Sequence, residues 1–560
     1  MTVGSSSTTK SHRDPLTIAF WLLILASLLP IWAFTYFPSQ DGPSHLNNAN
    51  ILRLYPWRDL EVFREFYTIN AFPFPNWTTH LLLAALMGVF PPLIAEKLFL
   101  SAYVISLPLA FRYCIRGINP AAQAGAFLVF PLIYHLLFQK GYYNFSMSIV
   151  LFFVCVGYWL RHRDNLNWRR TATLAALFLL LYFSHLVSTT LACATIGLLW
   201  MWFIVVELRQ PGETEPLRRK AVLTSAAGVA IRTLFAVLPA VLLGLWYLHH
   251  QGTQSQGSEP VTEKFQKIFT TAHAHKQHEL LVWIPWEVSL LGLALFVLLA
   301  RVRTPVKGPV NQDGPLLALA IFFLIYLAVP SEIGGGGGIE PRIVLYLWLT
   351  LALWLGIQTY SKTIGRAVAV VTGAVTLVLV AIHCGEYWAI DNYLSEYMSA
   401  GPFIEPGSTL LSMDLEDTRG IQFVHPFKHA AGYLAAQKNV VDFTNYEAGI
   451  DYFPVHFLPA SDPYKYIGDA EERPYVLDML DYSQRSGRSL DYVLLWGGNR
   501  PQMAARPDVQ SILGQLREGY EQIYVSPQHG LVRLYRRKQT GNRTAIRSAP
   551  AEVTPSSAPH

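Results

Sequence analysis

The polar residues of this sequence that could do chemistry lie beside long apolar stretches. The segment "FTYFPSQDGPSHLNNANI", residues 34–51, follows an apolar run and brings Asp41 and His45 together with several amides. A carboxylate with an ordinary pKa of about 3.9 is ionised at neutral pH and can accept a proton from an attacking hydroxyl group. Asp41-Gly42-Pro43 also fits a helix start, with the acid as N-cap and the proline in the first turn. We favour a catalytic Asp41, a role that capping does not exclude.

Further polar residues stand at the ends of later apolar stretches. Tyr143 and Asn144 follow a glycine in "GYYNF", His185 interrupts a long apolar run, and Glu340 and Arg342 close the run "SEIGGGGGIEPR". An arginine can bind a phosphate through two parallel hydrogen bonds, with an interfacial anchor as the equal alternative. A tyrosine-rich turn suits a sugar, with an ordinary aromatic belt as its alternative. Charged groups are costly inside a bilayer, so their clustering indicates an outward-facing polar site.

A metal site is the weaker interpretation of the histidine-rich segment "AHAHKQHE". It contains His273, His275, His278 and Glu279, and the last three can share one face of a helix. Histidines in a loop beside an amphipathic segment are the more common case. We therefore predict no metal there.

Composition identifies the class of protein. Hydrophobic residues make up 52% of the 560 residues and charged residues only 14%, and the mean hydropathy is +0.28. These values exclude an ordinary soluble protein and predict a polytopic α-helical membrane protein. The net charge of +5 does not indicate a nucleic-acid partner, because lysines and arginines of membrane loops serve topology first.

Eleven apolar segments are predicted to span the membrane. The run from residue 171 to 206 would be about 54 Å long as one helix, so we divide it at Ser184-His185. The short run 80–90 is predicted to be an interfacial helix. The predicted spans are 16–36, 93–111, 121–138, 142–160, 171–183, 187–206, 234–248, 282–300, 315–330, 343–359 and 367–383.

Charge distribution orients these spans. With the N-terminus inside, the inner segments carry 18 Lys and Arg in 81 residues and the outer segments carry 8 in 107. This asymmetry follows the positive-inside rule. We therefore expect residues 1–15 to be a cytoplasmic tail, residues 16–385 to form the transmembrane domain, and the part that follows to be extracytoplasmic.

The sequence changes character near Glu386. Residues 489–498 resemble a strand, residues 521–537 a hairpin and residues 475–485 a helix, which predicts an exported α/β domain over 386–538. Residues 539–560 have the composition of a disordered tail. The four cysteines lie in or at the ends of different spans and imply no disulfide framework.

Together these features resemble the GT-C superfamily of membrane glycosyltransferases. The resemblance rests on the acid of "FPSQDGPSHLNNA" after the first span, the "G-Y-Y-N-F" turn, the arginine at the outer start of a late span, and the C-terminal exported domain. It is closest to the bacterial members that use polyprenyl-phosphate sugars, which are related to protein mannosyltransferases and aminoarabinose transferases. Many members carry paired acids in the first outer loop, whereas Asp41 stands alone until Asp59 and Glu61. The sequence therefore favours transfer without a metal or other cofactor, with a divalent metal as the alternative.

The resemblance implies a mechanism and a location. Asp41 would be the general base, Arg342 would bind the donor phosphate, and the donor would be a polyprenyl-phosphate sugar. The acceptor would be a lipid, a glycan or a protein at the outer face of the plasma (inner) membrane, and transfer would invert the anomeric centre. The residues expected to contact the substrates are His45, Tyr143, Asn144, His185 and Glu340.

Two rival functions use the same features differently. A flippase or transporter for lipid-linked sugars also needs many spans and polar groups, but transporters usually show internal repeats and interrupted helices near the midplane. No repeat is visible in this sequence. A membrane-anchored binding protein would leave eleven spans without a purpose.

Overall fold

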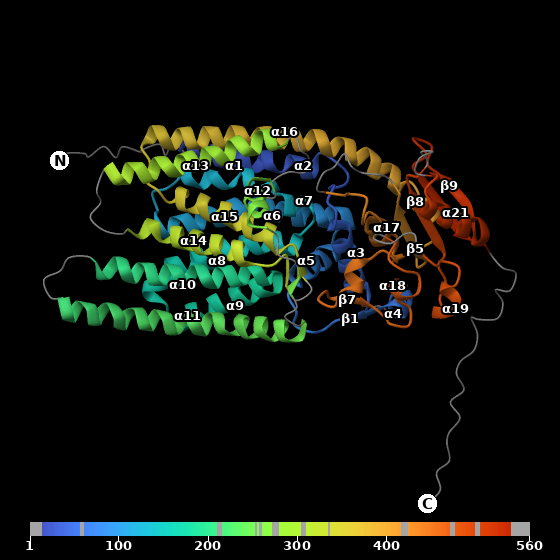
Figure 1. Cartoon of the computed structure of the whole chain (residues 1–560), viewed down its shortest axis with the longest axis horizontal. Helices are drawn as coiled ribbons and strands as arrows, with labels where there is room; N and C mark the ends of the chain where they lie inside the picture. The colour runs from blue at the N-terminus through green and yellow to red at the C-terminus, as the bar shows by residue number, and fades with distance from the viewer. Residues whose placement is uncertain are drawn as a thin grey trace, which may run out of the picture.

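The protein consists of a helix bundle with a smaller sheet-containing part at one end (Figure 1). The computed structural model describes residues 14–56, 61–209, 215–251, 255–256, 260–270, 279–303, 310–333, 336–415, 424–470, 477–498 and 504–538. Within these residues, nine helices are long and apolar enough to cross a membrane, so the chain is a polytopic helical membrane protein. They are α1 (Pro15–Ser27) with its continuation α2 (Leu29–Trp32), α6 (Pro92–Ile118), α8 (Tyr143–His162), α10 (Leu186–Leu208), α11 (Glu215–Gln251), α13 (Leu280–Arg303), α14 (Gly314–Ala328), α15 (Ile339–Gly356) and α16 (Lys362–Met398).

The predicted break in the long apolar run is confirmed. Helix α9 (Trp168–Ser184) ends where expected, and the His185 side chain accepts a hydrogen bond from Val187 N at the start of α10. Helix α9 has 17 residues, whereas the shortest of the nine spans have 18, which for α14 includes the preceding residues 311–313. The short run near residue 80 forms α5 (Thr78–Met87), an apolar helix too short to span a bilayer.

The prediction of one helix over residues 121–138 is wrong. This segment instead forms the 3₁₀ helices η1 (Ala124–Val129) and η2 (Pro131–Tyr134), followed by the short helix α7 (Leu136–Gln139). Pro131 has no N–H to donate, so it ends the regular ladder. The segment is buried among helices, where irregular backbone is tolerated at membrane depth. It still runs from the end of α15, where Gly125 abuts Gly356, to the neighbourhood of Asp41.

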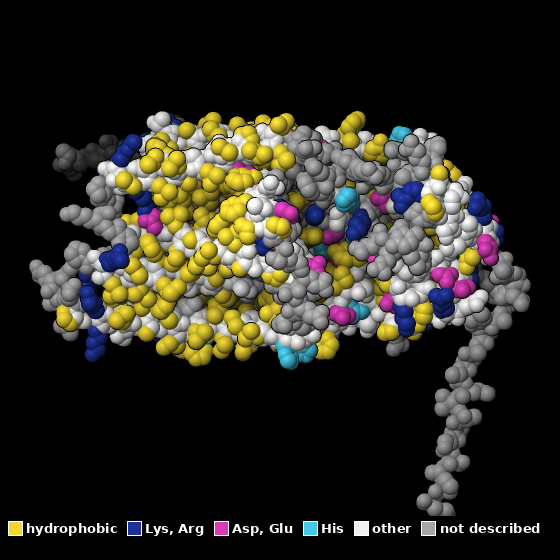
Figure 2. Space-filling view, in the orientation of Figure 1, with side chains coloured by type: hydrophobic (Ala, Val, Ile, Leu, Met, Phe, Trp, Pro, Cys, Tyr) yellow, Lys and Arg dark blue, Asp and Glu magenta, His cyan; other side chains and the backbone are white. Residues whose placement is uncertain are grey.

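The surface of the bundle is apolar where a bilayer would meet it. Figure 2 shows hydrophobic side chains in a continuous band along the helices, with charged side chains at one end and over the sheet-containing part. Basic residues end α8 and α13 on the side of the bundle away from the sheet. Exposed apolar side chains of the long helices include Met201, Leu234, Leu242, Leu245, Leu295, Leu298 and Leu324.

A mixed five-stranded sheet follows the last long helix. Its strand order is β6-β5-β8-β10-β9, with β5 parallel to β6 and β8 and with β10 antiparallel to β8 and β9. Helices of this part are short except for α21. The elements are β5 (Thr409–Asp414), α17 (Ala431–Lys438), β6 (Val441–Asp442), η7 (Tyr446–Gly449), β7 (Val455–Phe457), α18 (Pro463–Tyr466), α19 (Tyr482–Ser486), β8 (Tyr492–Trp496), α21 (Pro507–Gly519), β9 (Tyr520–Val525) and β10 (Val532–Arg537).

The structure refines what the sequence indicated for this region. The strand within 489–498 is β8, and β9 and β10 form the predicted hairpin. Within 475–485 only the short α19 is helical among the described residues. Helix α16 continues through Glu386 to Met398, so the change in composition near that residue falls inside a helix. The tail 539–560 lies outside the described residues.

The first loop of the chain is built into the sheet-containing part. Strand β1 (Tyr67–Ile69) pairs antiparallel with β7, and helices α3 (Gly42–Leu54) and α4 (Glu61–Phe66) add apolar side chains to the same core. At Gly432 of α17 a Cβ would lie only 2.3 Å from Pro43 O, so the two backbones touch. The helix that follows Asp41 is therefore held between the bundle and the sheet.

The remaining described elements are short connections. They include a small three-stranded sheet of order β2-β3-β4 beside the start of α15. These elements are η3 (Arg163–Asn165), β2 (Ser255–Gln256), α12 (Val261–Thr270), η5 (Asn311–Asp313), β3 (Glu332–Ile333), β4 (Gly336–Gly337) and η6 (Gly401–Phe403).

Candidate functional site

A cavity of about 540 Å³ lies where the bundle meets the sheet-containing part. Five residues singled out in the sequence line it, namely Asp41, His45, Asn144, His185 and Arg342. Its polar wall comes from α3, the start of α8, the start of α15 and the segment after η7. Its other wall is apolar and comes from the long helices. The apolar lining consists of Leu186, Val187, Leu191, Leu248, Ile325, Val329, Ile339 and Ile343.

Asp41 is the N-cap residue of α3, but its side chain makes no capping hydrogen bond. Its carboxylate instead accepts a hydrogen bond from Gln40 Nε2 at 3.0 Å, and His429 Nε2 lies 3.4 Å from Oδ1. Burial raises the pKa of Asp41 above its ordinary value, while His429 and His45 oppose that rise. A raised pKa makes the carboxylate a stronger base. The capping interpretation therefore explains the position of Asp41 but not the direction of its side chain.

Two glycines fix the backbone around Asp41. Gly141 has φ +86°, and a Cβ there would lie 2.5 Å from Gly42 N and 2.8 Å from Asp41 N. Lys140 O accepts a hydrogen bond from Asp41 N at 2.9 Å. Because only glycine combines a positive φ with such a close approach, the turn before α8 packs directly on the acid. This explains the glycine of "GYYNF".

Arg342 lies in the first turn of α15, and its side chain lines the cavity. Its Nη1 donates to the carbonyls of Gly337 and Gly338, and the cation lies 5.1 Å from the ring centre of Tyr142. Its Nε is buried and has no hydrogen-bond partner among the described residues. A buried donor without a partner is costly, so an oxygen ligand that reached Nε would stabilise it. The guanidinium is held in place and still has a donor to offer an anion.

His45 contacts a second histidine and a glutamate. Its Nδ1 lies 2.5 Å from Glu447 Oε1, and His80 Nε2 lies 2.8 Å from Glu447 Oε2. All three side chains are buried. Burial alone lowers the pKa of His45, but Glu447 and Asp41 outweigh it and raise the pKa above its ordinary value. The pKa of Glu447 is lowered, because both histidines offset the cost of burial. His45 therefore lines the cavity and is also held in place by its contact with Glu447.

Asn144 and His185 line the cavity while also supporting its walls. The Asn144 side chain accepts from Thr79 N at 2.9 Å and donates to Asn76 O at 3.1 Å, which ties α8 to the start of α5. His185 uses Nδ1 to cap α10. No hydrogen bond to the second ring nitrogen of His185 is found among the described residues. The oxygen and the nitrogen of the Asn144 amide are both used in these structural hydrogen bonds.

Tyr143 is placed differently from the sequence-based expectation. Its side chain is fully buried and does not line the cavity, whereas the preceding Tyr142 does. The Tyr143 hydroxyl donates to Glu96 Oε1 at 2.8 Å and lies 3.0 Å from Ser39 Oγ. The first turn of α8 points this ring toward α6. Tyr143 therefore joins elements of the bundle.

We expect Tyr143→Phe to lower thermal stability while the folded protein keeps its activity. The change leaves the buried Glu96 carboxyl without its short hydrogen bond, which should cost about 1–3 kcal/mol. The melting temperature in detergent measures this loss. Tyr142→Phe is the matched control, because it removes a hydroxyl from the cavity wall and should affect substrate binding more than stability. Equal melting temperatures for wild type and Tyr143→Phe would contradict the structural role.

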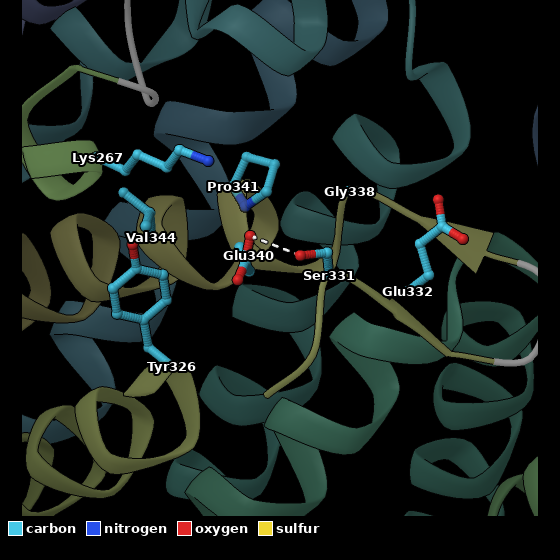
Figure 3. A pocket seen from close by; sticks show the side chains of 8 residues that line it. All are labelled: Lys267, Tyr326, Ser331, Glu332, Gly338, Glu340, Pro341 and Val344. Atoms are coloured by element: carbon cyan, nitrogen blue, oxygen red, sulfur yellow. Dashed lines mark hydrogen bonds between the residues drawn. The ribbon is translucent and has the colours of Figure 1, made fainter. Parts of the chain in front are cut away.

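Glu340 lies in a neighbouring cavity of about 260 Å³, not in the larger one (Figure 3). Its Oε1 is 3.3 Å from Lys264 Nζ, a buried cation that also donates to Val329 O at 2.7 Å. Figure 3 shows Glu340 pointing toward Ser331, whose hydroxyl is 3.4 Å from Oε2. Glu340 thus neutralises the buried Lys264 near the start of α15. Among the described residues, Gly338 alone lines both cavities.

Most of the residues considered as metal ligands in the sequence lie outside the described part of the chain. His273, His275, His278 and Asp59 lie outside the described residues. Glu279 is described, and its Oε2 lies 3.6 Å from His383 Nε2, with both side chains buried. Glu61 begins α4 and does not line either cavity.

Comparison with known proteins adds no family. No protein-family model matches the chain, and no curated protein matches its sequence. The site must therefore be interpreted from its own geometry.

Several cavity residues were not found from the sequence. Asn76 precedes α5, Tyr247 lies near the end of α11, and Tyr446, Tyr452 and Phe453 come from the segment around η7. Nothing in their local sequence distinguishes them from other amides and aromatic residues of the chain. The last three reach the cavity through the docking of a segment about 400 positions after Asp41 in the chain. Only the tertiary structure brings them to the cavity.

Proposed function

We propose that this protein is an integral membrane glycosyltransferase that takes a sugar from a polyprenyl phosphate. The observation that carries the proposal is one cavity that is lined by a buried carboxylate, by an arginine whose Nε has no partner among the described residues, and by an apolar wall of long helices. A polyprenyl-phosphate sugar has a matching division into polar head and apolar chain. Cavities that bind such amphipathic ligands combine apolar walls with a few placed polar groups.

The proposed reaction is a single displacement. The acceptor hydroxyl oxygen attacks the anomeric carbon, and Asp41 takes its proton as the new C–O bond forms. The bond from that carbon to the phosphate oxygen breaks, and polyprenyl phosphate leaves with the electron pair. Arg342 stabilises the charge on the departing phosphate. One displacement inverts the anomeric centre.

The surroundings of Asp41 and Arg342 suit these two roles. Asp41 is buried beside His429, so its carboxylate is desolvated and fixed in direction. Arg342 is anchored through Nη1 and stacked near Tyr142, so its Nε edge needs little ordering when an anion arrives. Preorganised groups of this kind contribute most to transition-state stabilisation. His185 and Tyr142 are placed to contact the sugar.

We propose that the cavity opens on the extracytoplasmic side of the plasma (inner) membrane. The basic residues that end α8 and α13 lie at the opposite end of the bundle, and the positive-inside rule assigns that end to the cytoplasm. A reporter enzyme fused after Arg485 should therefore be active outside, and one fused after Asn165 should be active in the cytoplasm. A cytoplasmic reporter at both positions would contradict the proposed sidedness.

Transfer and flipping give different products. Vesicles containing the purified chain are supplied with polyprenyl-phosphate mannose or polyprenyl-phosphate aminoarabinose, together with a membrane extract as the source of acceptors. Transfer releases free polyprenyl phosphate and labels an acceptor. A flippase would move the intact donor between leaflets and release nothing. Movement of donor without release would overturn the glycosyltransferase proposal.

A further inference from the structure

We propose that His45, His80 and Glu447 bind a divalent transition-metal ion such as Zn²⁺. One ligand atom from each of the three side chains lies within 4.8 Å of the others, and all three residues are buried. His45 Nδ1 and His80 Nε2 are 3.3 Å apart. Ligands about 2.0–2.1 Å from a tetrahedral zinc lie about 3.3 Å from each other, so the two nitrogens already have that spacing.

The hydrogen bonds on the far side of each ring fix which nitrogens are free. His80 Nδ1 faces Asn76 O at 2.9 Å, and His45 has a separate hydrogen bond to the backbone of Gly141. A carbonyl oxygen accepts, so the ring nitrogens that face the backbone carry the protons. Metal-binding histidines are usually oriented in this way, with the second N–H bound to a carbonyl.

Two lone pairs then converge on one carboxylate. When each ring is neutral, His45 Nδ1 and His80 Nε2 have no proton to offer Glu447. Three electron-rich groups in a dry site repel one another unless positive charge lies between them. Either two additional protons, one on each histidine, or one divalent cation supplies that charge. Both choices give the three side chains the same total charge. The dication binds all three ligands at once.

The glutamate favours the dication. Glu447 Oε1 faces His45 Nδ1 at 2.5 Å, and no other described group bonds to this oxygen. Its other oxygen accepts from Asn48 Nδ2 at 2.6 Å, and Asn48 and Asn445 exchange side-chain hydrogen bonds. One oxygen is thus positioned by the Asn48 amide and faces His80, and the other faces His45 alone. This arrangement is typical of a metal-binding carboxylate.

Ligand chemistry narrows the choice of metal. Two imidazoles and one carboxylate suit Zn²⁺ and related transition-metal ions, whereas Mg²⁺ and Ca²⁺ prefer oxygen ligands. Three protein ligands leave one tetrahedral position for water or another small ligand. The Phe453 ring centre lies 6.3 Å from that of His45 and 6.0 Å from that of His80, so an aromatic side chain covers part of the site.

The ligands come from three separate parts of the fold. His45 lies on α3, His80 on α5 and Glu447 on η7. An ion bound to all three would therefore join the bundle to the segment around η7 that lines the cavity. His45 is one helical turn from Asp41. The proposed role is therefore to hold the cavity together. It stands on this geometry and does not depend on the glycosyltransferase proposal.

The test measures metal content in the full-length purified protein. Wild type in detergent is treated with a chelator, incubated with Zn²⁺, freed of unbound ion and analysed by mass spectrometry. We expect about one Zn²⁺ per chain and a higher melting temperature than for the chelated protein. Glu447→Gln and His80→Ala should bring the zinc content to background. His250→Ala, an exposed histidine on α11, should leave it unchanged.

A second control separates this site from the other histidine cluster. A variant with His273→Ala, His275→Ala and His278→Ala should retain the ion. Loss of zinc in that variant, or retention in Glu447→Gln, would overturn the proposal. X-ray absorption of zinc-loaded wild type requires no folded variant. It should show two imidazoles with oxygen ligands, and a sulfur ligand or a spectrum without imidazole would contradict the site.

Discussion

Asp41→Asn is expected to reduce sugar transfer by about 10²–10⁴-fold while the protein stays folded. An amide takes no proton at neutral pH, and loss of a positioned general base costs about 3–5 kcal/mol in the transition state. Asparagine keeps the size of the side chain and can still accept from Gln40. The measurement is the rate of polyprenyl phosphate release by purified protein at saturating donor.

Stability should move in the opposite direction from that expected for a cap. The Asp41 side chain does not cap α3, so the substitution removes no capping hydrogen bond. Because burial raises the pKa of this carboxyl, the ionised form is disfavoured in the folded protein at neutral pH, and a neutral amide relieves that cost. We therefore expect an unchanged or higher melting temperature. Asp462→Asn is the matched control, because Asp462 does cap α18 and lies outside the cavity.

An opposite pair of results would reverse the assignment. If Asp41→Asn melts earlier and its folded fraction turns over normally, Asp41 is a structural residue. The glycosyltransferase proposal would then lose its general base. Zinc content provides an independent check on the fold of this variant, since His45 lies on the same helix.

The parts of the site that sequence reasoning found share a local signal. Asp41, His185 and Arg342 each interrupt or adjoin an apolar run, where a polar residue is costly and therefore conspicuous. Tyr143 shows the limit of that signal, because Tyr142 and Tyr143 look alike in sequence and only the helix phase of α8 decides which faces the cavity. Glu447 shows a further limit. Its partners are His45 and His80, and nothing near it in the chain indicates either.

For the fold, hydropathy predicted the long helices but not the irregular segment or the long-range strand pairing. Apolar length identified the long helices, and the break at His185 followed from the bilayer thickness. The buried 3₁₀ segment between residues 124 and 134 was not predictable from hydropathy, because an irregular segment shielded by helices is as apolar as a span. The insertion of α4 and β1 into the C-terminal core was also hidden, since strand pairing with β7 depends on contacts far apart in sequence.

Arg342→Gln is expected to weaken the binding of polyprenyl phosphate and to reduce transfer by about 10²–10³-fold, the usual cost of removing a preorganised donor from a developing anion. Arg342→Lys keeps the charge but loses the planar fork, so it should recover only part of the binding and less of the rate. The reason is geometric. The guanidinium uses Nη1 to hold the carbonyls of Gly337 and Gly338, and an ammonium group cannot keep both carbonyls and also reproduce the Nε–H donor.

Binding of Arg342 variants is measured by titration with polyprenyl phosphate alone, and the rate of transfer is measured with the sugar donor. Arg366→Gln, an exposed arginine on α16 outside the cavity, is the control and should change neither. If Arg342→Gln binds polyprenyl phosphate as tightly as wild type, the phosphate lies elsewhere, and Arg342 only anchors the turn before α15.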